Sequence, residues 1–303
     1  MRGLDFAIND LGLAVFTTLA PSATVAYIVL ALIALGGRLD PRARRCLESW
    51  LILPLAIATV GLIASATHLG TPSNALYVFS KVGFSPLSTE VFCAVVFLGT
   101  ACSYWLACIY FEHLRLLRML WLIASVGTAI VFLWGTTQAY GFSTVITWDT
   151  DLARLNLPFT GIAGSASLVL LVLVRCSQGL RKGLAVALVG LSAVAALAAC
   201  ITMGLQYVGL GALYNAYGTA QSLVPLYPVA IAAFGLCAFG SYALSLGALR
   251  RYWRANQTPS FDQDTPAEKR TGWWLIGATL LVYAGIFGVR FAFYCFHMTA
   301  GVV

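Results

Sequence analysis

The stretch GLAVALVGLSAVAALAAC, residues 183–200, contains no charged residue and a single hydroxyl group. It opens a run without Asp, Glu, Lys or Arg that continues to residue 249. A helix needs roughly 20 apolar residues to cross the hydrocarbon core of a bilayer, so this run is long enough for two spans and the loop between them. Barrel strands would be about 10 residues long with alternating polarity. The stretch therefore predicts an integral membrane protein built from helices.

The rest of the sequence has the same character. Its 303 residues are 60% hydrophobic and 10% charged, and their mean hydropathy is +0.87, which leaves too little polar surface for a soluble domain. Six further charge-free runs predict one span each, so we expect an all-α polytopic membrane protein with eight transmembrane helices. We expect residues 1–303 to form a single membrane domain with a polar inner loop at 250–270. The expected spans are 11–36, 48–68, 88–110, 116–140, 157–175, 184–207, 223–249 and 271–294.

The basic residues indicate the orientation of this domain. Of the 18 Lys and Arg residues, 14 fall in the loops that follow the first, third, fifth and seventh expected spans. Cytoplasmic loops carry an excess of Lys and Arg, so both termini and the loop 68–90 are predicted to face outward. The formal net charge of +7 therefore reflects the orientation of the protein in the membrane. We expect a lipid bilayer and no nucleic acid as a partner.

Four ionisable residues fall at the outer ends of their expected helices: His68, Glu90, Arg290 and His297. Such residues are costly at membrane depth and often mark a function. On the last helix, Arg290, Tyr294 and His297 are spaced i, i+4 and i+7, which places them on one face if the helix continues that far. His68 and Glu90 border one short loop, where they could take protons from a bound substrate and release them outside.

Each of the four also has an ordinary structural interpretation. His68 could bond a loop carbonyl, and Glu90 could be a first-turn helix residue with Ser88 as the cap. Arg290 could extend to the lipid headgroups or pair with Glu90, and His297 could lie outside the bilayer. The sequence leaves both interpretations open.

Several further polar residues are expected to be less informative. Lys81 is more consistent with a solvated loop charge or a partner contact, and His113 with a solvated residue. Trp148 is expected at the membrane interface. The eight cysteines contain no CxxC pair, which disfavours a disulfide or iron–sulfur framework.

The sequence shows no obvious redox centre of its own. With three histidines, a single bis-histidine haem is the most that the protein could hold, and it would need His68 and His297. We therefore expect no haem or metal in this protein. Electrons would pass from a bound organic molecule to a partner docked outside.

Three segments resemble one known family. HLGTP (68–72), VGFSPLSTE (82–90) and RFAFYCFHM (290–298) are similar, in this order, to segments of the membrane-anchor subunits of dimethyl sulfoxide reductase-type molybdoenzymes. The longer, more charged loop at 250–270 and Cys295 depart from that pattern.

The resemblance implies a quinol-oxidising subunit in the cytoplasmic (inner) membrane of a prokaryote. It would bind a quinol, commonly menaquinol, and pass electrons to an iron–sulfur subunit and through it to a molybdopterin catalytic subunit on the outer face. It implies quinol-site roles for His68 and Glu90, with His68 taking the proton and Glu90 passing it outward. Arg290, Tyr294 and His297 would line the site or hold Glu90.

Three alternatives remain. A secondary transporter would bind its substrate between charged residues, but such sites usually lie near the bilayer midplane rather than at one surface. A single-haem cytochrome would use His68 and His297. A purely structural anchor would have no quinone site at all.

Overall fold

A computed structural model describes residues 7–36, 39–67, 72–111, 113–141, 145–176, 180–215, 218–255 and 266–298. Within these ranges, eight helical segments are long and apolar enough to cross a membrane, which confirms the predicted all-α, eight-span class. The long helices are α2 (Leu11–Leu35), α3 (Pro41–Trp50), α4 (Ile52–Ala66), α5 (Pro86–Tyr110), α6 (Arg115–Gln138), α7 (Asp151–Arg175), α8 (Lys182–Gly209), α9 (Tyr227–Ala255) and α10 (Pro266–Tyr294). The shorter elements are the 3₁₀ helices η1 (Pro72–Lys81), η2 (Leu210–Ala212) and η3 (Ala220–Leu223), and the strands β1 (Tyr214–Asn215) and β2 (Gly218–Thr219).

Several helices extend beyond the predicted spans. α9 continues to Ala255 and α10 begins at Pro266, so the prediction of a loop over 250–270 was wrong at both ends. Arg, Ala, Glu and Lys are good helix formers, so the charges end the apolar run without ending the helix. α7 begins six residues before the predicted 157, because the Thr150 side chain accepts a hydrogen bond from the Ala153 amide at 3.1 Å.

The second span consists of two consecutive helices, α3 and α4, which together cover Pro41–Ala66. The interruption falls at Leu51, three residues before Pro54. Proline has no backbone N–H, so Pro54 cannot donate to the carbonyl of Trp50 four residues earlier. The second span begins at Pro41, earlier than the predicted residue 48. Pro54 interrupts its backbone hydrogen bonds near the middle.

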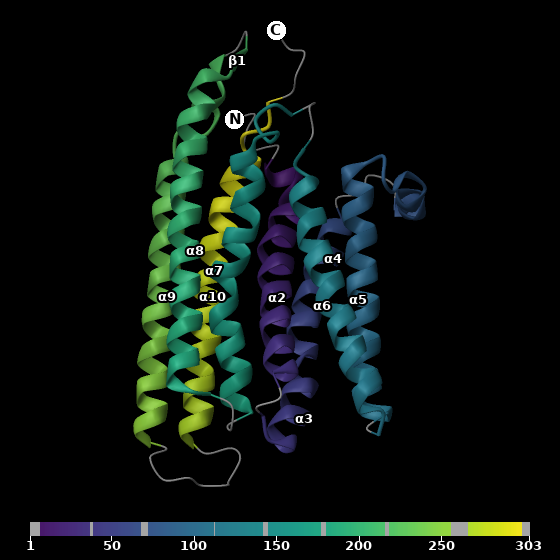
Figure 1. The fold of residues 1–303 in the computed structure, drawn as a ribbon. Helices are drawn as coiled ribbons and strands as arrows, with labels where there is room; N and C mark the ends of the chain where they lie inside the picture. The colour runs from purple at the N-terminus through teal and green to yellow at the C-terminus, as the bar shows by residue number, and fades with distance from the viewer. Residues whose placement is uncertain are drawn as a thin grey trace.

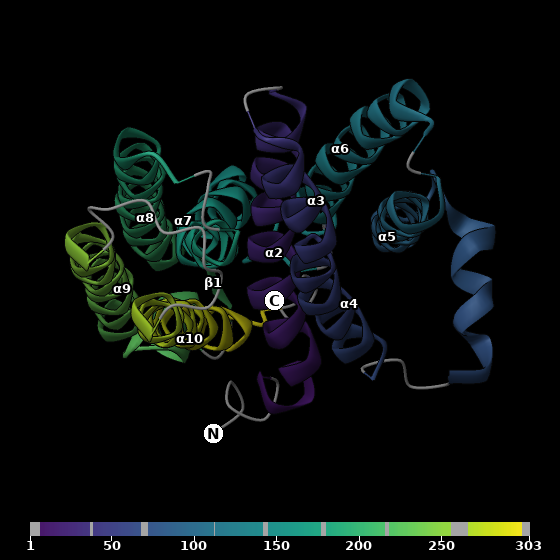
Figure 2. The same cartoon turned by 90° about the horizontal axis from the view of Figure 1, so that it is seen from below.

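The helices run side by side as a bundle with α2 at its centre (Figure 1). α7, α8, α9 and α10 lie on one side of α2, and α5 and α6 lie on the other, next to α4 (Figure 2). α2 packs against α4, α6, α7 and α10, and α7 packs in turn against α8 and α10. α2 and α7 are the most buried of the spans, so the core of the molecule lies between them.

Small residues let the central helices approach closely. A methyl group at Gly164 of α7 would stand 2.8 Å from the Ser22 Cβ of α2, and one at Gly161 would stand 3.2 Å from the Pro21 Cβ. A methyl group at Gly61 of α4 would stand 3.2 Å from the Ala20 nitrogen of α2. Glycine at such positions is how helices associate in lipid, where burial of apolar surface supplies no driving force.

Both described ends of the chain lie at the same end of the bundle, the upper end in Figure 1. There α2, α5, α7 and α9 begin and α4, α6, α8 and α10 end, while α3 and the beginning of α6 lie at the opposite, lower end. The strands β1 and β2 form a small antiparallel pair at the upper end, with Tyr214 opposite Thr219. η1 lies outside the bundle beside α5 (Figure 2). The predicted site residues that the structure describes, Glu90, Arg290, Tyr294 and His297, thus belong to the upper end.

Candidate functional site

Glu90 lies in the second turn of α5, deeper than the sequence predicted. The helix begins at Pro86 with Ser85 as its cap, and the Ser85 side chain accepts a hydrogen bond from the Ser88 amide at 3.4 Å. The prediction that Ser88 is the cap was therefore wrong, because Pro86 is already suited to the first helical position. Since the helix dipole acts mainly within the first turn, it does not account for Glu90.

The Glu90 side chain is turned into the bundle. It is 5% exposed, and its Oε1 is buried with no hydrogen-bond partner among the described residues. α6 lies against it: a methyl group at Gly135 would stand 3.6 Å from the Glu90 Cα, and the Thr136 hydroxyl is within hydrogen-bonding reach of the carboxylate. A buried polar atom without a partner is costly, so an orphaned carboxylate oxygen calls for an explanation.

Arg290 is buried near the end of α10 rather than extended to the headgroups, which overturns that prediction. It is 1% exposed, and its Nη2 donates to the Thr160 hydroxyl of α7 at 2.9 Å. Its guanidinium carbon lies 6.0 Å from the centre of the Phe293 ring. No ion pair joins Arg290 to Glu90, both of which belong to the described part of the chain, so the predicted pair is also absent. Arg290 is therefore a buried cation held by a hydroxyl and an aromatic face.

Tyr140 and Tyr294 connect the ends of α6 and α10. Their hydroxyls are hydrogen-bonded to each other, and the Thr17 hydroxyl of α2 is within hydrogen-bonding reach of Tyr294. The charges of Glu90 and Arg290 both act on this tyrosine pair. Burial raises the pKa of Tyr140 well above its ordinary value, with Tyr294 acting in the same direction and Arg290 opposing it. Tyr140 therefore keeps its proton at neutral pH and remains a hydrogen-bond donor.

Tyr140 was not among the predicted site residues. Its signal in the sequence was a tyrosine at the last residue of an expected span, which is typical of an ordinary interfacial residue.

His297 lies beyond the end of α10, so the predicted i, i+4, i+7 stripe is wrong at its last member. It remains at the site through other contacts. Its ring centre is 5.1 Å from that of Trp148, and its Nδ1 is 3.9 Å from the Asp10 carboxylate. Trp148 is 8% exposed and packs on Phe293, so its ring faces the protein. The tertiary fold thus places His297 near the buried tyrosines without helical periodicity.

The segment around Trp148 is fastened to the C-terminal end of the described residues. The Thr147 hydroxyl donates to the Phe296 carbonyl, and it accepts a hydrogen bond from the Met298 amide at 3.5 Å. These two contacts hold Trp148 and His297 on the same side of the tyrosine pair.

His68 lies outside the described residues, so its predicted role is neither supported nor contradicted. The described part of α4 leads to Thr67, which lies close to Gly12 near the beginning of α2. Lys81 ends η1 and is exposed, consistent with its expected solvated position. His113, which was also expected to be solvated, is exposed as well.

The arrangement suits proton transfer coupled to the binding of a small polar ring. It offers a buried acceptor with a free lone pair, a hydrogen-bonded pair of phenols that has one hydroxyl hydrogen left to donate, and one buried cation, within a low-dielectric region where such groups interact strongly. Among the described residues, no cluster of three or more His, Cys, Asp or Glu side chains could hold a metal ion.

Comparison with known proteins points to one family. The family model described as "DMSO reductase anchor subunit (DmsC)" matches residues 4–252, well over half of the sequence. The protein is 27% identical over 226 residues to the C subunit of the anaerobic dimethyl sulfoxide reductase of Haemophilus influenzae, and the match spans 75% of its own length and 80% of that relative. It is 26% identical over 298 residues to the corresponding C subunit of Escherichia coli, a match that spans 96% of each protein. It is also 27% identical over 215 residues to the anaerobic dimethyl sulfoxide reductase subunit YnfH of Escherichia coli, with 71% and 74% spanned.

Proposed function

The protein belongs to the DMSO reductase anchor subunit family, and from this premise we propose that it binds and oxidises a quinol of the menaquinol type at the upper end of the bundle. Membership of the family makes it a multi-pass membrane anchor of a DMSO reductase complex, with catalytic and electron-transfer subunits as partners. We propose further that the upper end faces outward across the cytoplasmic membrane of a prokaryote. There it would meet an iron–sulfur subunit, and through it a molybdopterin catalytic subunit.

The reaction sets what the site must supply. Oxidation of one quinol to the quinone releases two electrons and two protons, so a proton acceptor must lie close to each ring hydroxyl as the electrons leave. In this proposal the electrons pass to the iron–sulfur partner and both protons leave at the upper end. The anchor itself would carry no haem or metal for this step.

The observation that carries the proposal is the orphaned Oε1 of Glu90. A carboxylate buried at membrane depth without a complete set of partners is expensive unless a ligand or a proton completes it. The charges of Glu90 and Arg290 both act on the hydroxyl of Tyr140, and this gathering of polar groups favours a polar ring in the same place. This combination fits a quinol head better than it fits a surface used only for docking.

Each residue then has a distinct role in the proposal. His68 takes a proton from the quinol, and Glu90 receives it and passes it outward. The one hydroxyl hydrogen of the Tyr140–Tyr294 pair that is not used between them donates a hydrogen bond that orients the ring, and Arg290 opposes the accumulation of negative charge at the tyrosine pair. His297 and Asp10, which lie 3.9 Å apart, lead from the buried groups toward the surface.

The test is quinol oxidation by the purified complex, comparing wild type with Glu90→Gln and His68→Ala. Loss of a general base typically costs about 100-fold or more in rate, so we expect quinol-dependent turnover to fall by about that factor. A reduced artificial dye, which donates electrons directly to the partner subunits, should support normal turnover in both variants. This second assay shows that the complex is assembled.

Two matched control variants distinguish a role in the reaction from the general effect of removing a carboxylate or a histidine. Asp151→Asn removes a carboxylate that is 92% exposed at the same end of the bundle, and His113→Ala removes an exposed histidine at the other end. Both should oxidise quinol at the wild-type rate. If Glu90→Gln and His68→Ala also do so, the protein has no quinol site at these residues and serves as a structural anchor.

A further inference from the structure

A second buried carboxylate, Glu48, organises the lower end of the bundle. It is 3% exposed and lies on α3, where Arg44 donates to its Oε1 from Nε at 3.1 Å. The Tyr104 hydroxyl of α5 donates to the same oxygen at 3.1 Å, and Arg118 of α6 pairs with Oε2. Three helices are therefore fastened together through one carboxylate. In the sequence these arginines indicate only the orientation in the membrane, and nothing in their spacing predicts that Arg118 and Glu48 meet.

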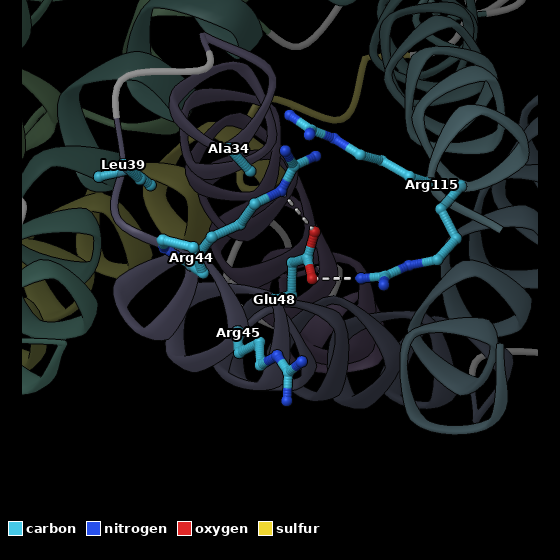
Figure 3. Close-up of a pocket in the computed structure, with 8 residues that line it drawn as sticks. Ala34, Leu39, Arg44, Arg45, Glu48 and Arg115 are labelled. Carbon is cyan, nitrogen blue, oxygen red and sulfur yellow. Dashed lines mark hydrogen bonds and ion pairs between the residues drawn. The ribbon is translucent and has the colours of Figure 1, made fainter. Parts of the chain in front are cut away.

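The cluster forms one wall of a cavity of about 230 Å³. Figure 3 shows the guanidinium groups of Arg44 and Arg115 pointing toward one another, with Glu48 bonded to Arg44 below them. The lining residues are Ala34, Leu39, Pro41, Arg44, Arg45, Glu48, Arg115 and Arg118. The lining thus contains four arginines and a single carboxylate, and that carboxylate already satisfies two of the arginines.

Charge repulsion makes this arrangement costly unless an anion enters it. Guanidinium groups that face each other across a small cavity repel, and each remains charged at any physiological pH. Arg115 forms no ion pair in the part of the chain that the structure describes, and the buried Nε of Arg118 has no acceptor there. The positive-inside rule explains why solvent-exposed arginines are frequent in cytoplasmic loops. It does not explain why several arginine side chains converge on one cavity.

The backbone adds to the positive potential. α3 begins at Pro41 and α6 begins at Arg115, and neither helix has a side-chain cap at its N-terminus. Uncapped first-turn amides and the positive end of the helix dipole both favour an anion. Pro41 and Arg115 both line the cavity, so two helix N-termini and the guanidinium groups of Arg44, Arg115 and Arg118 act on the same space, whereas Arg45 points away from it (Figure 3).

We propose that this cavity binds a phosphate group, either the headgroup phosphodiester of an anionic lipid or inorganic phosphate. Arginine binds phosphate oxygens in a bidentate manner, and basic pockets between transmembrane helices on the cytoplasmic side suit anionic headgroups. Arg44 and Arg118, oriented by Glu48, form the fixed part of the site, and Arg115 closes it from α6. Leu116, Leu117 and Leu120 are exposed on the same helix just beyond the cavity, where they would meet the acyl chains of a bound lipid.

The test uses the purified protein after removal of co-purifying lipid. Native mass spectrometry measures retention of phosphatidylglycerol, with phosphatidylcholine as the zwitterionic comparison, and a parallel arm measures the shift in thermal unfolding caused by inorganic phosphate. The variant is Arg115→Gln, which leaves the Glu48 cluster intact. The matched control is Arg42→Gln, an exposed arginine on α3 that does not line the cavity.

We expect Arg115→Gln to weaken phosphatidylglycerol retention roughly fivefold, the effect of one basic residue at a membrane surface, and Arg42→Gln to leave it unchanged. Retention of phosphatidylglycerol identifies a lipid as the ligand, while a shift with inorganic phosphate alone identifies the free anion. Equal weakening by both variants would reduce the effect to diffuse surface charge and overturn the site. Binding of neither probe to the wild-type protein would overturn it as well.

Discussion

The phenol hydroxyls of Tyr140 and Tyr294 are hydrogen-bonded to each other, which joins the end of α6 to the end of α10 although the residues are 154 positions apart in sequence. α6 and α10 lie on opposite sides of α2 (Figure 2), and the Thr17 hydroxyl of α2 is within hydrogen-bonding reach of Tyr294. The charges of Glu90, on α5, and of Arg290, on α10, both act on this pair. The site therefore contains residues from both sides of α2, that is, from α5 and α6 on one side and from α10 on the other.

Removal of one hydroxyl from this pair should affect both stability and turnover. We expect Tyr140→Phe to lower the free energy of unfolding by about 1 kcal/mol, since Tyr294 loses a buried partner, and to slow quinol oxidation without slowing the artificial-dye assay. Tyr214→Phe is the control, because Tyr214 is exposed at the same end. Thermal unfolding and the two turnover assays provide the measurements. Unchanged quinol oxidation in Tyr140→Phe would exclude the tyrosine pair from the site.

The hydrogen bond from Arg290 to Thr160 should contribute to the free energy of unfolding of the bundle. Thr160→Val removes the acceptor of its Nη2 and leaves a buried guanidinium without a hydrogen bond in the described part of the chain, which should cost about 1–3 kcal/mol. Thr279→Val is matched in chemistry, because the buried Thr279 hydroxyl bonds only the Leu275 carbonyl of its own helix. The midpoint of thermal unfolding should fall further for Thr160→Val. Equal midpoints would mean that Arg290 does not need this contact.

Close packing of α7 on α2 predicts opposite outcomes for two glycines. Gly164→Ala places a methyl group 2.8 Å from the Ser22 Cβ and 2.9 Å from the Ile286 Cδ1, so it should destabilise the bundle by about 1–3 kcal/mol. Gly190→Ala meets no atom within 4 Å and should stabilise α8 by roughly 0.5–1 kcal/mol. Thermal unfolding of the two variants distinguishes them by sign. A gain for Gly164→Ala would contradict the packing of these helices.

The distribution of basic residues predicts the orientation in the membrane. Lys81 is exposed at the upper end and Arg42 is exposed at the lower end. In intact cells, a membrane-impermeant maleimide should label Lys81→Cys and leave Arg42→Cys unlabelled, because the lower end is predicted to be cytoplasmic. Permeabilised cells should label both variants, and the wild-type protein gives the background of its native cysteines. The reverse pattern would place the proposed quinol site on the cytoplasmic side.

Local sequence accounts for the spans but only partly for their ends. The charge-free runs located all eight membrane helices, because transfer of about 20 apolar residues into lipid is a local property of the sequence. The ends of α7, α9 and α10 were misplaced, since capping and helix propensity extend a helix past the residues that lie in lipid. The break before Pro54 follows from proline chemistry and could have been anticipated.

The site was predicted as a set of residues at one end, and that part was sound for the described members. Glu90, Arg290 and Tyr294 are all buried at the upper end, and His297 lies beside them. The predicted pair between Arg290 and Glu90 and the helical stripe through His297 were wrong. The depth of a residue in the membrane follows from its position along a helix. Which side chains contact each other depends on which helices lie side by side.

By itself, the sequence determined the membrane class, the number of spans and the end of the bundle at which the polar residues gather. These properties follow from the free energy of transfer of each residue into lipid, which adds up along the sequence, and from the position of each residue along its helix. Only the tertiary structure decided that Arg290 meets Thr160, that Tyr140 meets Tyr294, and that Glu48 collects two arginines and a tyrosine. Apart from the bond between Arg44 and Glu48, which lie four residues apart on α3, those contacts join residues at least 56 positions apart and depend on which helices lie side by side. Glycines of α4 and α7 let these two helices pack closely on α2.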